Sequence, residues 1–124
     1  MRALTIRQPH AQLILLREKT IELRSWTTSY RGPLLICAGA RPDLDLGYPT
    51  GVMLCTVELI AVRPFMPADA AAARSRFRPG LYAWILAQVQ AVAPRPIKGQ
   101  LGLFHVPDQN VWISANGKSV RNAR

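Results

Sequence analysis

A short segment near the N-terminus combines a lysine, a carboxylate, a guanidinium and an indole, and these groups could act together on a ligand. The segment is residues 19–26 (KTIELRSW), and its pattern predicts a β-strand. Alternate residues of a strand share a face, so the face predicted to carry a site comprises Thr20, Glu22, Arg24 and Trp26. The opposite face carries Ile21 and Leu23, with Lys19 at its start, and is predicted to pack in the core. A carboxylate accepts hydrogen bonds and a guanidinium donates them in a planar fork, so the pair could recognise a base edge or a phosphate.

The balance of charge points to a polyanionic partner. Sixteen Lys and Arg residues oppose seven Asp and Glu residues, which gives a net charge of +9, and thirteen of the cations are arginine. Basic residues extend from Arg2 to Arg124, so a folded basic surface rather than a charged tail would attract the partner. An arginine-rich genome would produce the same excess. Because no amphipathic helix rich in Lys and Arg is visible, a membrane surface is not the expected partner.

The sequence predicts neither a metal site nor a cofactor. Cys37 and Cys55 lie inside apolar runs and are predicted to be buried on neighbouring strands. Together with the two histidines, His10 and His105, they lack the spacing of a zinc site. No apolar run reaches the ~20 residues of a membrane-spanning helix. The expected location is therefore the cytoplasm.

Hydrophobic patterning predicts a mostly β (α+β) fold in a single domain over residues 1–113, followed by a basic tail at 114–124 that is expected to fray. Predicted strands cover residues 4–7, 19–26, 34–38, 51–62, 81–92 and 97–106, with a short final strand at 111–113. Predicted helices cover 10–18 and 68–77. Five or six strands with two short helices and no repeated βαβ unit are typical of a small β-barrel.

Several segments, in this order and spacing, resemble the ASCH domain family, whose fold is related to the PUA barrel. They are residues 4–9 (LTIRQP), 19–26 (KTIELRSW), 30–36 (YRGPLLI), 82–84 (YAW) and 96–103 (PIKGQLGL). The resemblance implies a PUA-like barrel with a crevice beside the first helix and the 19–26 strand. An RNA, another nucleic acid or a modified nucleotide would bind there. One departure is Arg17, which stands where the family usually has a glycine between the helix and this strand.

The residues that the resemblance and the charge pattern assign to nucleic-acid binding lie on four segments. Phosphate contacts, base-edge hydrogen bonds and one stacked ring would combine, and Trp26 is expected to be more exposed than Tyr82 and Trp84. The predicted binding residues are Arg7, Gln8, Lys19, Thr20, Glu22, Arg24, Trp26, Arg31 and Lys98.

Two alternatives stay open beside nucleic-acid binding. Some relatives are hydrolases that cleave RNA or the amide of acetylated cytidine, and the latter carry a Lys-Thr-x-Thr motif. Lys19 matches its lysine, but Glu22 replaces the second threonine. For a metal-independent hydrolase, the candidate catalytic residues are Lys19, Thr20, Glu22 and Tyr30, and the histidines receive no role. A protein-interaction module for an acidic partner is the other alternative.

Overall fold

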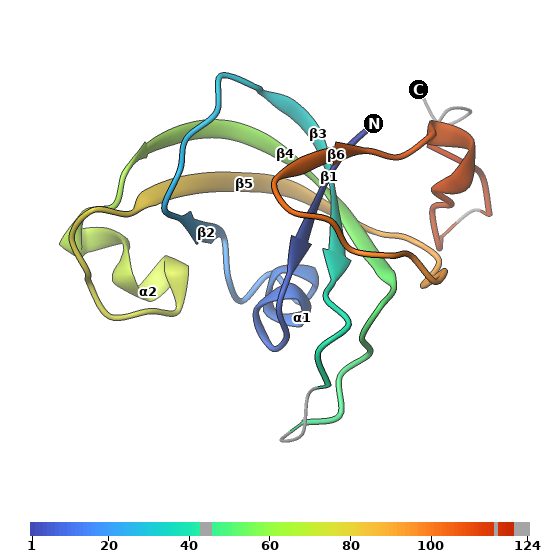
Figure 1. The fold of residues 1–124 in the computed structure, drawn as a ribbon, viewed down its shortest axis with the longest axis horizontal. Helices are drawn as coiled ribbons and strands as arrows, with labels where there is room; N and C mark the ends of the chain where they lie inside the picture. The colour runs from blue at the N-terminus through green and yellow to red at the C-terminus, as the bar shows by residue number, and fades with distance from the viewer. Residues whose placement is uncertain (43–45, 116, 121–124) are drawn as a thin grey trace.

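A single six-stranded sheet curls into a half-barrel and forms the body of the protein (Figure 1). The computed structural model describes residues 1–42, 46–115 and 117–120. The strands are β1 (Arg2–Ile6), β2 (Ile21–Arg24), β3 (Gly32–Ala38), β4 (Met53–Pro64), β5 (Tyr82–Ala91) and β6 (Leu103–His105). Their order in the sheet is β2-β5-β4-β3-β1-β6, with β1 parallel to β3 and all other neighbours antiparallel. The prediction of a mostly β, PUA-like fold is confirmed.

The helical segments are shorter than predicted. They are α1 (His10–Leu15), the 3-10 turn η1 (Pro67–Asp69), α2 (Ala70–Ala73) and the 3-10 turn η2 (Asp108–Asn110). Arg17 (φ 63°) and Arg74 (φ 52°) take the left-handed conformation and end α1 and α2, so the predicted helices 10–18 and 68–77 are too long. Within the described ranges, no helix has the length and hydrophobicity needed to span a bilayer.

Three strand predictions also need correction. The predicted strand 97–106 shrinks to β6, because Gly102 (φ 67°) turns the chain directly before Leu103. The strand predicted from Lys19 begins only at Ile21. At the other end of the chain, residues 111–113 make isolated bridges rather than a strand.

Both faces of the sheet are buried. Leu34 and Ile36 of β3 pack with α1 in one cluster, while Leu35 and Cys37 pack in a second cluster on the other face. Such two-sided burial explains the uninterrupted apolar sequence of β3. Cys37 and Cys55 lie in different clusters, both fully buried as predicted, and burial raises the pKa of each thiol to about 12. The thiols are therefore protonated and unreactive.

Part of the predicted C-terminal tail packs on the domain. Ser119 and Val120 are buried, and the Val120 N–H donates to the Val111 carbonyl at 2.8 Å. Val120 belongs to the second core cluster. Residues 116 and 121–124 lie outside the described residues.

The left-handed Arg17 offers a test of how the first helix ends. Its guanidinium also donates to the Val89 carbonyl at 3.0 Å, so Arg17→Ala removes that bond and keeps the backbone strain. Arg17→Gly removes the bond and the strain together. We expect the glycine variant to be more stable than the alanine variant by about 1 kcal/mol, because only glycine adopts this conformation without a steric penalty. Urea unfolding of the two variants measures the difference, and equal stabilities would contradict this account of the turn.

Candidate functional site

A crevice of about 710 Å³ opens where the end of β1, the start of α1, β2 and the segment after α2 meet. Figure 1 shows β2 between α2 on one side and α1 with the end of β1 on the other. Polar and basic side chains dominate the lining, which comprises Thr5, Ile6, Arg7, Gln8, Pro9, His10, Lys19, Glu22, Leu23, Arg24, Ser75 and Arg78. Five of the predicted binding residues, Arg7, Gln8, Lys19, Glu22 and Arg24, therefore lie in one hollow.

A buried carboxylate organises the crevice. The Glu22 side chain is 8% exposed and lies between two cations. Its Oε1 is 3.6 Å from the Lys19 Nζ, and its Oε2 is 3.0 Å from an Arg24 terminal nitrogen. The prediction that Lys19 and Glu22 lie on opposite faces is therefore wrong. Lys19 precedes β2, so strand alternation does not govern the direction of its side chain.

Lys19 is the most deeply buried charged residue of this group. Its side chain is 2% exposed, and Nζ donates a hydrogen bond of 2.6 Å to the Ala73 carbonyl at the end of α2. Burial lowers the pKa of Lys19, and the Glu22 carboxylate offsets part of that effect. The amine therefore loses its proton more readily than an exposed lysine would.

Arg24 connects β2 to β1, two strands that are not neighbours in the sheet. One terminal nitrogen contacts Glu22 and also donates to the Thr5 carbonyl at 2.9 Å. Arg24 Nε is buried and has no hydrogen-bond partner among the described residues. The side chain therefore bridges the open side of the half-barrel and keeps one donor unused.

His10 also lines the crevice, although sequence reasoning gave it no role. Burial lowers the pKa of His10, and the positive charges of Lys19 and Arg7 act in the same direction. The imidazole is therefore neutral at pH 7, with one donor and one acceptor nitrogen. Its Nδ1 is buried and, within the described part of the chain, has no partner.

Gln8 has a structural task in the crevice wall. Its Oε1 accepts from the Gln12 N–H and its Nε2 donates to the Pro49 carbonyl, each at 2.8 Å. Both ends of the amide are thus in use, and they tie the start of α1 to the loop before β4. Arg7, by contrast, is exposed at the edge of the crevice.

The other predicted site residues lie outside the crevice. Trp26 is half-buried, as is Tyr82, and it packs edge-on against the fully buried Trp84 with ring centroids 4.9 Å apart, so it is more exposed than Trp84 as expected. Tyr30 donates its hydroxyl to the Pro33 carbonyl and is likewise half-buried. Thr20 and Arg31 are exposed away from the crevice, and Lys98 lines a separate hollow.

Ser75 and Arg78 are crevice residues that sequence reasoning missed. They follow α2, more than 50 positions from β2 in the sequence, and no motif links the two segments. The left-handed Arg74, which ends α2, directly precedes this segment. Basic residues after a short alanine-rich helix were the only available signal.

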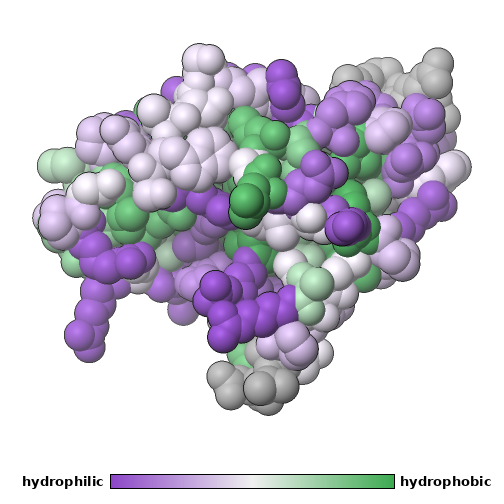
Figure 2. All heavy atoms as spheres, in the orientation of Figure 1, coloured by the Kyte–Doolittle hydropathy of each residue, from purple (hydrophilic) through white to green (hydrophobic). Residues whose placement is uncertain are grey.

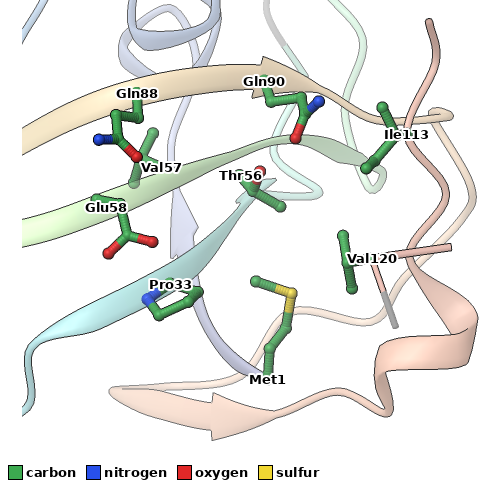
Figure 3. A pocket seen from close by; sticks show the side chains of 9 residues that line it. All are labelled: Met1, Pro33, Thr56, Val57, Glu58, Gln88, Gln90, Ile113 and Val120. Atoms are coloured by element: carbon green, nitrogen blue, oxygen red, sulfur yellow. The ribbon is translucent and has the colours of Figure 1, made fainter. Parts of the chain in front are cut away.

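A smaller hollow of about 170 Å³ has a different character (Figure 3). Figure 3 shows Glu58, Gln88 and Gln90 directed into it from β4 and β5, with Met1 on the opposite wall. Its lining includes a carboxylate and no Lys or Arg side chain, so it suits a polyanion less well than the crevice does. Among the described residues, no three His, Cys, Asp or Glu side chains gather as potential metal ligands.

Comparisons with known proteins agree with the fold. The sequence model of the ASCH domain matches residues 4–96, which confirms the resemblance. The solved ASCH structure from Zymomonas mobilis has a TM-score of 0.60 and 15% identity, covering 86% of this chain and 87% of that one. A tyrosine-to-phenylalanine mutant of the same protein has a TM-score of 0.61 and 14% identity, covering 86% of this chain and 89% of that one. A serine-to-alanine mutant has a TM-score of 0.62 and 14% identity, covering 86% of this chain and 87% of that one. At these identities the likeness shows the fold alone. No curated protein sequence gives a significant match.

The buried cluster makes a prediction for stability. Glu22→Gln leaves Lys19 buried without its countercharge and should cost about 3 kcal/mol of unfolding free energy. The matched control is Glu18→Gln, which breaks an exposed pair with Arg74 at 3.8 Å and should cost less than about 1 kcal/mol. Urea unfolding at pH 7 compares the two. Equal losses would show that the Glu22 carboxylate does not hold the crevice together.

Proposed function

The chain belongs to the ASCH domain family, and we propose that its crevice binds RNA or a modified nucleotide. The observation that carries the proposal is the gathering of Arg7, Lys19, Arg24 and Arg78 around one hollow in a chain of net charge +9. A crevice of about 710 Å³ is within the usual size range of small-ligand sites. Phosphate groups complement this lining.

The rim of the crevice suits phosphate. Arg7 and Arg78 are both exposed, and among the residues that the structure describes neither guanidinium has an ion-pair partner. A free guanidinium can form two parallel hydrogen bonds to a phosphate. Ser75 also lines the crevice, but its hydroxyl already donates to the Arg76 carbonyl at 3.1 Å, so the two arginines are the groups that would hold the phosphate.

The floor of the crevice suits a base. A neutral His10 has one donor and one acceptor nitrogen, of which Nδ1 is buried, and Glu22 keeps lone pairs beyond the two that its cations occupy. Leu23 supplies an apolar contact. Gln8 supports this surface without reading the base, because its amide is already bonded at both ends.

The binding proposal predicts salt-sensitive affinity. With labelled single-stranded RNA, log K should fall with log salt by ~0.7 for each phosphate contacted. Arg7→Gln and Arg78→Gln should each weaken binding several-fold and reduce that slope by ~0.7. Arg31→Gln is the control, because Arg31 is exposed and lines neither the crevice nor the hollow that Lys98 lines. Fluorescence polarisation at several salt concentrations gives both quantities.

Three results would oppose the binding proposal. They are salt-independent binding, no binding to any RNA pool, and equal effects of all three arginine variants. Displacement of RNA by polyglutamate at equal charge concentration would favour the acidic protein partner instead.

A second function, hydrolysis, is favoured by one observation, the lowered pKa of the buried Lys19. A neutral Lys19 amine could take the proton from a ribose 2′-hydroxyl, whose oxygen then bonds to phosphorus while the 5′-oxygen leaves. It could equally deprotonate a water molecule that attacks the amide carbon of acetylated cytidine. The exocyclic amine of the cytosine is then the leaving group. Thr20 and Tyr30 do not line the crevice, so His10 and Glu22 are the better placed assisting groups.

Hydrolysis predicts turnover that depends on the lysine amine. The protein should cleave labelled RNA or acetylated cytidine, and the rate should rise with pH as Lys19 loses its proton. Because the pKa of Lys19 is lowered, this rise should occur at a lower pH than the pKa of an exposed lysine. Lys19→Met and Lys19→Arg should both abolish turnover, and thermal unfolding checks that each variant is folded. Turnover that survives in folded variants, or that is absent from the natural protein, would dismiss this function.

A further inference from the structure

A further hollow of about 380 Å³, which we call the second hollow, lies beside residues 96–100, which lead into β6. It is distinct from the crevice and from the 170 Å³ hollow at β4 and β5. Its floor includes the apolar Ile97 and Phe104, and its rim carries Lys98, Gln100, His105 and Asn110. The lining contains no Asp or Glu. An apolar floor with amide and imidazole groups at its edge and a nearby cation suits a nucleobase with its phosphate.

This second hollow adjoins the crevice at one contact. Thr5 lines the crevice, and a Cβ placed on Gly99 would lie only 3.0 Å from the Thr5 Cγ2. The Gln100 N–H also donates to the Thr5 Oγ1 at 3.3 Å. Lys98 and Gln100, which flank Gly99, line the second hollow. Thr5 of the crevice therefore contacts the 98–100 segment of the second hollow, and we call this contact the Thr5–Gly99 ridge.

An unused apolar side chain lies beside this ridge. Leu101 follows Gln100 and is 99% exposed, so it contributes nothing to the core. In Figure 2, hydrophobic residues lie open over the segment that leads into β6, above hydrophilic residues over the start of α1. Exposed apolar side chains of this kind can pack against bases or between them.

We propose that the ligand is a single-stranded RNA chain that occupies both hollows. One nucleotide lies in the crevice, the chain crosses the Thr5–Gly99 ridge, and the next base enters the second hollow with Leu101 against it. Lys98 is exposed and, among the described residues, has no ion-pair partner, so it is free to contact the connecting phosphate. This inference rests on the proposed RNA binding and adds that a free nucleoside fills only part of the site.

The test compares a pentanucleotide of single-stranded RNA with a nucleoside monophosphate. The pentanucleotide should bind at least about tenfold more tightly, because a stacked base and a phosphate contact are added. Leu101→Thr and Lys98→Gln should each remove most of that gain and leave the affinity for the monophosphate unchanged. Lys98→Gln should also lower the salt slope for the pentanucleotide by ~0.7.

Each control makes the same type of substitution as a test variant, but at a position outside the linings of the crevice and the second hollow. Ile60→Thr changes an apolar side chain that is 56% exposed on β4, and Lys118→Gln removes an exposed lysine near the C-terminus. Neither should alter the affinity for either ligand. If the pentanucleotide and the monophosphate bind equally, or if the control variants weaken the pentanucleotide as much as the test variants, the second hollow is not part of the site and the proposed function stands. Binding of neither ligand would overturn both proposals.

Discussion

A carboxylate removed from water must be surrounded by positive charge and donors, and the crevice depends on how Glu22 meets that requirement. Lys19 and Arg24 provide the charge, and both cations make a further hydrogen bond to a backbone carbonyl. Those carbonyls belong to Ala73 at the end of α2 and Thr5 in β1. One side chain thus determines how two separate segments, the end of α2 and β1, lie beside β2. Loss of the carboxylate would weaken both connections at once.

The same cluster explains why a structural arrangement can also be a binding surface. Two cations share one anion, so the interior of the crevice keeps a positive charge that Arg7 and Arg78 extend to its rim. In a partly buried site this excess attracts an anion more strongly than an exposed arginine does, because water screens it less. The carboxylate holds the two cations in place before a ligand arrives, so binding requires little rearrangement of the wall.

Much of the fold could be predicted from the sequence because its signals are local. The apolar run of β3, the Lys19–Trp26 segment and the spacing of the family motifs were sufficient for the sheet and for five crevice residues. The wrong predictions lie at the ends of helices and strands, where a periodic pattern no longer determines the direction of a side chain or the length of an element. Alternation failed for Lys19 because the strand begins two residues later, and the second helix ended early at a left-handed arginine that no residue preference indicates. Ser75, Arg78 and His10 join the crevice only through tertiary packing, which periodicity does not report.

The open sheet has two free edges, β2 and β6, which are only four and three residues long. A free edge exposes unpaired backbone donors and acceptors to any passing strand, and long flat edges promote aggregation. Here each edge offers too few residues for stable pairing with another chain. The half-barrel can therefore remain open between β2 and β6 without pairing its edge strands with those of other copies. The crevice on this open side then stays accessible to a ligand.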